Sequence, residues 1–284
     1  IQFFDFKSLN KILRKIIKKK FLIDRATCSI FFENIILKNN KILNFQDPIY
    51  QLKAIKNHKE IENIKLAHKY DGAALTKYIF WLKKNFNKKK ITELSGSKKL
   101  YDLRKKNSKF KFLSFPTISG TGPNGAIIHY NPNKKSDRRL KQGDVYLVDS
   151  GGQYKLGTTD VTRTVSLKNT NQRVKNIYTR VLKGHIAVAN YKLKKNTTGA
   201  IIDKKARKYL NQIGLDYSHG TGHGVGYFLN VHEGPQGISK NNKVILKEGM
   251  VLSNEPGYYE KNKFGIRIEN LIYVKKKKSK KLFE

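Results

Sequence analysis

The acidic residues are the most informative ones in this chain, because they are scarce. The sequence has 21 Asp and Glu against 59 Lys and Arg in 284 residues. Asp149 closes the apolar run 145–148, and Asp160 follows eleven residues later, beyond a Gly-Gly pair. Two carboxylates at the ends of neighbouring strands can converge on one point. For either residue alone, capping of a turn is the competing interpretation.

A group of histidines stands among glycines further along the chain. His219 and His223 lie in the segment 219–226, and His232 brings the number of histidines to three within fourteen residues. A lone histidine is usually structural, but three in a glycine-rich segment of low charge favour a functional site. His129 follows two isoleucines, and we expect it to lie in an apolar strand.

Two glutamates near the C-terminal end complete the set of candidate residues. Glu255 belongs to the segment 254–259, and Glu269 belongs to the segment 265–270. In a strand, Arg267 and Glu269 share one face. A carboxylate inside an apolar strand is costly unless it is paired or binds a metal ion. Arg267 is a candidate partner, so an ion pair competes with a metal site here.

Two Asp, one His and two Glu form an oxygen-rich ligand set with a single nitrogen. This set suits Mn²⁺, with Co²⁺ or Zn²⁺ as alternatives, better than it suits a structural zinc ion. Two metal ions that share carboxylates at a separation of about 3.5–4 Å can hold a water between them and lower its pKa. Four carboxylates balance the charge of two divalent cations, and the remaining histidines would then serve a substrate.

The residue pattern predicts the elements that position these side chains. Apolar residues at helical spacing predict helices over 58–86, from Thr92 onward, over 171–190 and over 198–213, the last one ending at Gly214. Strand-like runs are 28–32, 125–130, 145–149, 161–167, 250–254 and 264–274. Helices and strands do not alternate regularly, which favours an α+β fold with an antiparallel sheet.

Composition narrows the setting of the protein. Cys28 is the one cysteine, so no intrachain disulfide can form, and we expect a reducing, cytoplasmic compartment. The sequence contains no stretch of 18 apolar residues, so we expect no transmembrane helix. The net charge of +38 is typical of nucleic-acid binding. However, Lys far outnumbers Arg, and the lysines are spread along the chain despite local runs at 18–20, 88–90 and 275–278. We therefore expect no specific nucleic-acid partner.

The motifs, taken in order, resemble the aminopeptidase P family (X-Pro aminopeptidases) of the pita-bread peptidases, in its long eukaryotic form. The resemblance is dense over residues 114–270 and weaker over 48–113. The segments that carry it are 114–118, 122–130, 148–151, 157–164, 219–226, 230–235, 255–259 and 265–270. The resemblance implies the pita-bread (creatinase/aminopeptidase) fold, in which helices flank a curved antiparallel sheet.

The resemblance also implies a metal ligand for each acidic motif. Asp149 would be the terminal carboxylate of one metal ion, and Asp160 and Glu269 would bridge two ions. His223 and Glu255 would complete the second metal site. A hydroxide held between the ions would then attack the bond that joins an N-terminal residue to a penultimate proline.

The resemblance further implies catalytic and substrate-binding roles for residues of these motifs. Glu255 would face the nucleophilic water and carry its proton to the leaving amine. His129 would lie near the scissile carbonyl and the developing oxyanion. His219 and His232 would line the proline side of the peptide, with Arg267 near the same pocket.

The resemblance implies a domain division as well. Residues 1–47 would be the remnant of a preceding creatinase-like N-terminal domain, and 48–284 would be a pita-bread catalytic domain that is truncated at its C-terminal end. We therefore expect the chain to be a fragment. The resemblance implies that the part of the protein that would follow contributes to homodimer contacts in the full-length protein.

Three alternatives remain beside the X-Pro aminopeptidase. Prolidase and methionine aminopeptidase-like peptidases share the metal pattern, but the long motif at 115–130 and the run 219–235 favour aminopeptidase P over both. A non-catalytic pita-bread module that binds histones or nucleic acid would suit the charge. That alternative predicts lost metal ligands, yet all five candidate positions are filled.

Overall fold

The computed structural model describes residues 3–275 of the chain. These residues form two compact units, and the division between them lies between Lys53 and Ala54, inside helix α3 (Pro48–Ala54). We describe each unit by itself. The origin of the smaller unit in a preceding creatinase-like domain over residues 1–47 stays a prediction. The predicted basic run at 275–278 lies, from Lys276 onward, outside the described residues.

The smaller unit combines short helices with one pair of strands. Its elements are a 3-10 helix (Phe6–Ser8), α1 (Leu9–Lys15), β1 (Lys20–Ile23), α2 (Ile30–Leu37) and β2 (Lys41–Asn44). β1 and β2 are parallel, in the register that pairs Lys20 with Lys41. The predicted strand at 28–32 is wrong. The Ser29 hydroxyl accepts a hydrogen bond from the Phe31 amide and so caps the start of α2, which buries Ile35 and Ile36.

Four long helices of the larger unit confirm the helical predictions. They are α4 (His58–Asn85), α5 (Glu93–Lys105), α6 (Gln172–Ala189) and α7 (Gly199–Asn211). Reciprocal capping boxes start α4 at Asn57 and α5 at Thr92, and the Asn171 side chain caps α6. Shortly after the end of α7, Gly214 has a φ of +69°, which glycine adopts without strain.

The strands of the larger unit pair only in the antiparallel sense among the described residues. The strands β4 (Ile118–Thr121), β5 (Val145–Ser150) and β8 (Val161–Ser166) form one sheet, with β5 in the centre. A second sheet joins β3 (Phe110–Leu113), β6 (Gly152–Tyr154) and β7 (Gly157–Thr158). The remaining pairs are β9 (Gly222–His223) with β10 (Gly237–Ile238), β11 (Val251–Asn254) with β14 (Asn270–Tyr273), and β12 (Gly257–Glu260) with β13 (Phe264–Arg267).

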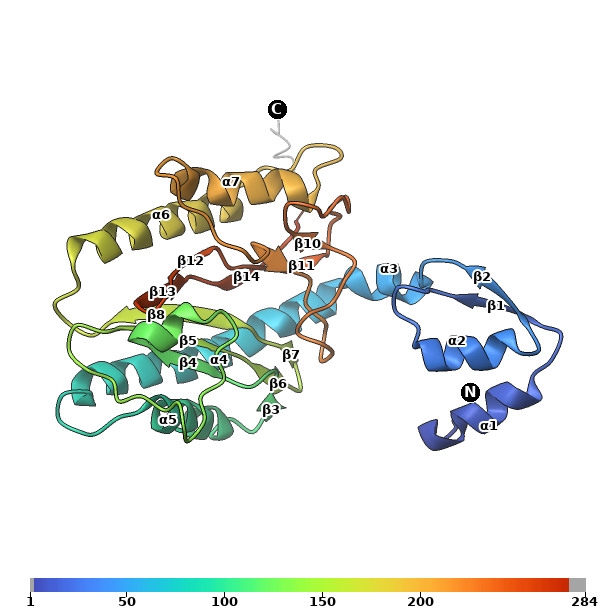
Figure 1. Ribbon diagram of the computed structural model, residues 1–284, viewed down its shortest axis with the longest axis horizontal. Helices are drawn as coiled ribbons and strands as arrows, with labels where there is room; N and C mark the ends of the chain where they lie inside the picture. Colours follow the sequence, from blue (N-terminus) through green and yellow to red (C-terminus); the bar gives the residue numbers. More distant parts are fainter. Residues whose placement is uncertain (1–2, 276–284) are drawn as a thin grey trace, which may run out of the picture. The chain divides into compact units, whose positions relative to one another are not determined.

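Two helix pairs enclose these strands. Figure 1 shows the strands between the pair α4–α5 on one side and the pair α6–α7 on the other. Apolar residues of α4 and α5, such as Leu75 and Leu100, form one core with Val148 of β5, and residues of α6, such as Ile177, form another core with Ile266 of β13. The α+β architecture with antiparallel strands is therefore as predicted.

Two predicted strands differ from the structure. Residues 122–126 form a 3-10 helix rather than the start of a strand, because Gly122 has a φ of +54° and Pro123 follows it. His129 consequently lies in a turn. The run 264–274 is divided into β13 and β14, and Glu269 lies at the break between them.

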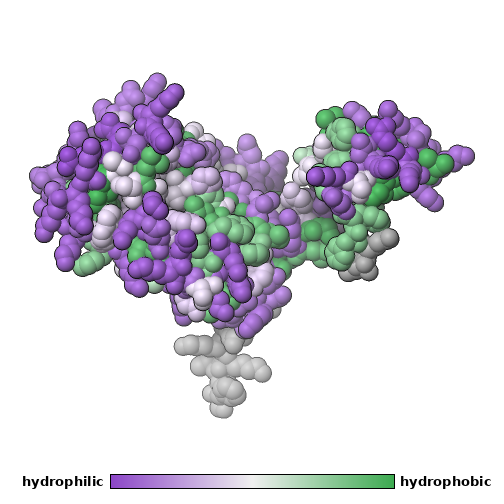
Figure 2. Space-filling view, turned by 90° about the horizontal axis from the view of Figure 1, so that it is seen from below, coloured by the Kyte–Doolittle hydropathy of each residue, from purple (hydrophilic) through white to green (hydrophobic). Residues whose placement is uncertain are grey.

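The surface of the larger unit is mainly polar. Of the lysines within residues 3–275, only Lys56 is buried. Hydrophilic residues cover most of the face seen in Figure 2, with a hydrophobic area among them. None of the helices in the described part of the chain has both the length and the apolar character that a membrane crossing requires.

Candidate metal centre

A cavity of about 570 Å³ in the larger unit gathers the residues that the sequence singled out. Its walls combine aromatic and apolar side chains, such as Phe115 and Val231, with charged ones. No lysine is among the residues that line it. All nine candidate side chains are part of its lining: His129, Asp149, Asp160, His219, His223, His232, Glu255, Arg267 and Glu269.

The two aspartates come from neighbouring strands. Asp149 is the penultimate residue of β5 and lies opposite Thr162 of β8, while Asp160 directly precedes β8. The chain between them is longer than a simple loop, since it forms β6 and β7. Gly151 permits this path, because a Cβ atom there would lie 1.9 Å from the Thr159 carbonyl oxygen.

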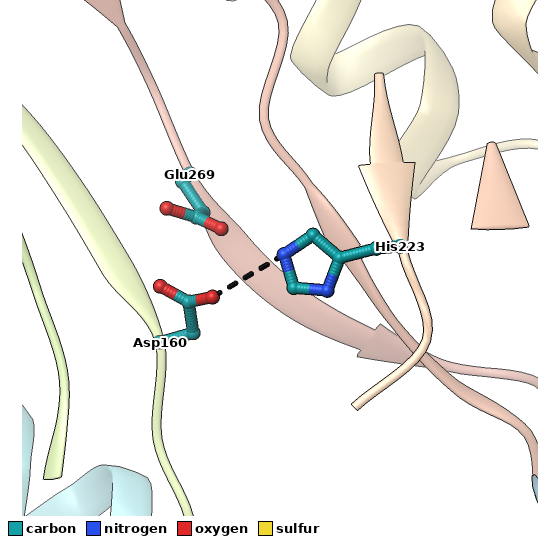
Figure 3. Close-up of side chains that lie close together, drawn as sticks. All are labelled: Asp160, His223 and Glu269. Carbon is teal, nitrogen blue, oxygen red and sulfur yellow. Dashed lines mark ion pairs between the residues drawn. The ribbon is translucent and has the colours of Figure 1, made fainter. Parts of the chain in front are cut away.

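Asp160, His223 and Glu269 form the centre of the site. One ligand atom of each lies within 4.8 Å of the others, and Figure 3 shows the imidazole of His223 pointing toward the two carboxylates. The His223 Nδ1–H donates to the Gly224 carbonyl oxygen at 2.9 Å. Its Nε2 therefore presents a lone pair to the cavity, as a metal-binding histidine requires.

Glu255 extends this centre. Its Oε1 lies 3.3 Å from the Nε2 of His223, and the Asp160 Oδ2 lies 3.4 Å from the same nitrogen. The Ser253 hydroxyl donates to Glu255 Oε1 at 3.0 Å, and the Thr162 hydroxyl donates to Glu269 Oε2 at 2.6 Å. Four ligand-type side chains thus converge, and two of them are oriented by hydroxyl groups, one from β11, which directly precedes Glu255, and one from β8.

Asp149 is held in a different way. Arg267 Nη2 donates to its Oδ2 at 2.6 Å, so Arg267 pairs with Asp149 and not with its strand neighbour Glu269. The other oxygen, Oδ1, is buried and has no hydrogen-bond partner within residues 3–275. A buried carboxylate oxygen without a donor is expensive unless a cation binds it.

Hydrogen bonds continue from Arg267 to His219. Arg267 Nη1 donates to the Tyr259 hydroxyl oxygen at 2.5 Å, and the Tyr259 hydroxyl in turn donates to His219 Nε2 at 2.9 Å. His219 Nδ1–H donates to the Gly220 carbonyl oxygen at 2.7 Å. Both ring nitrogens of His219 are therefore occupied. Sequence reasoning did not assign a role to Tyr259, although it noted the motif that contains it.

The electrostatics of the site fit a divalent cation. Burial, followed by repulsion from Asp149 and Glu255, raises the pKa of Asp160 well above its ordinary value. Burial and the charge of Asp160 do the same to the pKa of Glu269, and burial raises the pKa of Glu255. Crowded, buried carboxylates beside an orphaned oxygen and an imidazole lone pair form a donor set that suits Mn²⁺, Co²⁺ or Zn²⁺.

His219 and His232 both have lowered pKa values, which favour their neutral rings. Burial, with the charge of Arg267, lowers the pKa of His219 to about 4. Burial and the neighbouring His223 lower the pKa of His232 to about 4. The rings of His223 and His232 lie edge to face, with centroids 4.0 Å apart. His232 and His129 therefore lie on the cavity wall beside the metal-type ligands.

Comparison with known proteins identifies the family. Residues 62–276 match the model of metallopeptidase family M24. The chain belongs to metallopeptidase family M24. All the candidate ligands lie within the matched part of the chain.

Several M24 relatives are named as X-Pro aminopeptidases. A probable Xaa-Pro aminopeptidase P of Laccaria bicolor is 49% identical over 277 residues, which cover 96% of this chain and 43% of that protein. A protein of the same name in Coprinopsis cinerea is 51% identical over 237 residues, which cover 82% of this chain and 38% of that one. The chain thus spans about two fifths of the length of the relatives that it matches.

Solved structures show the same fold. An X-prolyl aminopeptidase of Caenorhabditis elegans, described as a cytosolic enzyme with a di-nuclear active site, matches with a TM-score of 0.78 and 40% identity over 84% of this chain and 39% of that one. The prolidase of Pyrococcus furiosus matches with a TM-score of 0.80 and 28% identity over 96% and 78%. The larger unit has the pita-bread fold of M24 peptidases, as the sequence resemblance implied.

Proposed function

We propose that the full-length protein is a metal-dependent aminopeptidase that hydrolyses the bond between an N-terminal residue and a penultimate proline. The observation that supports this most strongly is the convergence of Asp160, Glu255 and Glu269 on His223 Nε2, in one cavity with the Asp149–Arg267 pair. The names of the relatives add the proline specificity.

The donor set would divide between two divalent ions. Asp149, Asp160 and Glu269 would hold one ion, and His223 and Glu255 would complete the second site with the same bridging pair, Asp160 and Glu269. Mn²⁺ suits this oxygen-rich set best, with Co²⁺ or Zn²⁺ as alternatives. When bound, such ions lower the pKa of water and polarise a peptide carbonyl.

The side chains of this protein would handle the proton and the peptide. Glu255, oriented by the Ser253 hydroxyl, would accept a proton from the attacking water and deliver it to the leaving proline nitrogen. His129, on the cavity wall, would face the scissile carbonyl oxygen, and the neutral ring of His232 would position the peptide. His219 would contribute its ring to the proline side, since its two nitrogens are already bonded.

Proline explains why a dedicated site is needed. The X-Pro bond is a tertiary amide without an N–H group, with a fixed φ and two isomers, so peptidases that recognise an ordinary backbone fit it poorly. Aromatic and apolar walls formed by Phe115, Ile128 and Val231 provide contacts that do not require that N–H.

A prolidase activity is the second candidate. The match to the Pyrococcus furiosus prolidase favours it. Its TM-score of 0.80 and its coverage of 96% of this chain exceed the 0.78 and 84% of the aminopeptidase match. The two activities differ in whether the substrate continues beyond proline. A non-catalytic binding module is disfavoured, since all five ligand positions carry ligand-type residues in the cavity.

Peptide length separates these candidates. Purified full-length protein with Mn²⁺ should release alanine from Ala-Pro-Ala and leave Ala-Ala-Ala intact. Cleavage of the dipeptide Ala-Pro without cleavage of Ala-Pro-Ala would support the prolidase alternative. Equal cleavage of Ala-Pro-Ala and Ala-Ala-Ala would contradict proline specificity.

We also propose a cytosolic location and a homodimeric full-length protein. The cytosolic description of the Caenorhabditis elegans enzyme and the unpaired Cys28 support the location. Fluorescence imaging of the tagged full-length protein tests the location, and light scattering tests the oligomeric state. A secreted protein or a monomer would contradict these proposals.

A further inference from the structure

His185 is a buried, titratable residue that the proposed reaction does not use. It lies on α6, is 7% exposed, and reaches the end of the β11–β14 ladder. Its Nδ1 lies 3.0 Å from the Asn254 carbonyl oxygen, and its Nε2 lies 3.3 Å from Asn270 Nδ2. Asn254 and Asn270 are direct cross-strand partners at the last position of the ladder. One imidazole thus spans the two strand ends.

The surrounding groups fix the state of this imidazole. A carbonyl oxygen only accepts, so Nδ1 must carry the hydrogen and Nε2 must accept from the Asn270 amide. The Asn270 amide cannot rotate, because its Oδ1 accepts from Arg163 Nη2 at 2.8 Å. The Asn254 amide donates to the His185 carbonyl oxygen at 2.9 Å, which adds a second bond between α6 and β11. Burial lowers the pKa of His185 and so favours the neutral ring that these bonds require.

The two residues that His185 bridges are sequence neighbours of two candidate metal ligands. Asn254 precedes Glu255, and Asn270 follows Glu269. Both glutamates leave the ladder at this point: the Glu255 amide donates to the Thr221 carbonyl oxygen and the Glu269 amide to that of Thr162. Backbone pairing between β11 and β14 therefore does not extend to the glutamates.

Arg163 also forms hydrogen bonds at the start of β14. Its Nη1 donates to the Glu269 carbonyl oxygen at 2.6 Å, while its Nη2 binds Asn270. Side chains from β8 and α6 thus add to the backbone pairing of Asn254 with Asn270 in holding Glu269 relative to Glu255. Of these, His185 is the one that contacts both strand ends.

We propose that His185 is a positioning residue that sets the separation of Glu255 and Glu269 and thereby the affinity of the site for divalent metal. The inference rests on the proposed function, because it takes these glutamates as metal ligands. Groups that orient ligands from outside the coordination shell typically change metal affinity by about 10–100-fold when they are removed.

The two metal ions should not be affected equally. The ion on the His223 side would receive both glutamates, whereas the ion on the Asp149 side would receive Glu269 alone. A change in the separation of the glutamates should therefore weaken one binding step more than the other. General loosening of the fold would weaken both steps alike.

The test is calorimetric titration of the metal-free full-length protein with Mn²⁺, without peptide. His185→Phe keeps the ring volume and removes both bonds, and we expect about a tenfold weaker affinity, concentrated in one of the two steps. His185→Gln, which keeps an amide donor and acceptor, should recover part of the loss and serves if the Phe variant does not fold. The matched control is His68→Phe, because His68 is a histidine of α4 whose one hydrogen bond within the described part of the chain joins it to the Ile64 carbonyl of its own helix.

Affinity of folded His185→Phe within twofold of the wild type would overturn the inference, and so would the same result for His185→Gln where only that variant folds. An equal loss in His68→Phe would also overturn it, because the effect would then be general. Wild-type protein that binds no Mn²⁺ would contradict the proposed function itself. Wild-type binding with an unchanged His185 variant would contradict only the positioning role.

Discussion

Arg267 and Asp149, 118 residues apart in the sequence, form a buried ion pair with an N–O distance of 2.6 Å at the edge of the candidate metal centre. The pair occupies one carboxylate oxygen and leaves Oδ1 buried without a donor. Through Tyr259 the same guanidinium is linked to His219. A single arginine thus orients a metal-type ligand and a histidine on the cavity wall.

Loss of Arg267 should therefore affect both folding and activity. Arg267→Met leaves Asp149 buried without its counter-charge, and breaking a buried pair in this way costs about 3–5 kcal/mol of the free energy of unfolding. We expect hydrolysis of Ala-Pro-Ala to fall together with stability. Urea denaturation and steady-state kinetics of the full-length protein measure the two effects.

An exposed arginine gives the control for that variant. Arg173 binds Glu260 at 3.0 Å, but its side chain is 58% exposed, and surface pairs contribute little to stability. Arg173→Met should leave the unfolding midpoint and the kinetic constants close to those of the wild type. Equal losses in the two variants would show that burial of the Arg267 pair does not matter.

Two glycine-to-alanine substitutions in helices should have opposite effects. At Gly184 in α6, a Cβ atom would lie 2.3 Å from the Ala206 carbonyl oxygen of α7, so Gly184→Ala should destabilise the protein by about 1–3 kcal/mol. At Gly72 in α4, no atom of residues 3–275 beyond the local helix backbone lies within 4 Å of such a Cβ atom, so Gly72→Ala should stabilise the protein by about 0.5–1 kcal/mol. Thermal unfolding of both variants checks the signs, and a stabilising Gly184→Ala would contradict the close packing of α6 on α7.

The buried acids predict how the stability of the metal-free protein varies with pH. The raised pKa of Asp160 means that the folded state keeps a proton that the unfolded state releases. The contribution of Asp160 to stability is therefore largest below the unfolded-state pKa and is lost as pH rises through the raised folded-state pKa. Asp160→Asn cannot ionise, so it should lose less stability than the wild type as pH rises above the ordinary Asp pKa of 3.8.

The same Asp160 variant should lose its enzymatic activity. If Asp160 is a metal ligand, as proposed, it should matter more than a group outside the coordination shell, so we expect Asp160→Asn to lower hydrolysis by more than about 100-fold. Asp102→Asn on the exposed side of α5 serves as the control and should change neither the pH dependence nor the activity. A variant with wild-type activity would contradict the ligand role of Asp160.

His219 predicts a pH dependence of the opposite sign. Its pKa of about 4 lies below the ordinary value of 6.5, so the unfolded state binds a proton that the folded state excludes. The stability that the neutral ring provides is present above pH 6.5 and is lost as pH falls toward 4. Denaturation curves of His219→Gln should show a shallower loss over this range. An unchanged slope would contradict the burial of a neutral imidazole.

Local signals explain what the sequence predicted well. α4 and α6 combine an apolar face at helical spacing with a capping Asn, Asn57 or Asn171, and both helices are present. The apolar run before Asp149 is β5. The same kind of signal was misleading at 28–32, where the cap at Ser29 outweighed the strand-forming residues, and at 125–130, where the backbone of Gly122 turns the chain.

Such local signals could not predict contacts between residues that are distant in the sequence. Arg267 was paired with Glu269 by strand alternation, but the strand breaks at Glu269, and the guanidinium reaches Asp149 instead. Tyr259 and His185 act through hydrogen bonds to residues 40 and 69 positions away, which no local pattern encodes. The candidate ligands could be listed from motifs, whereas the groups that orient them required the structure.

The most direct test of the account is a metal titration of the metal-free full-length protein during hydrolysis of Ala-Pro-Ala. We predict no release of alanine before Mn²⁺ is added, a rise in rate that ends when two ions are bound per chain, and no release by Glu269→Gln at any Mn²⁺ concentration tested. Release of alanine at the same rate by the metal-free protein, or by Glu269→Gln, would contradict a metallopeptidase site built on these residues.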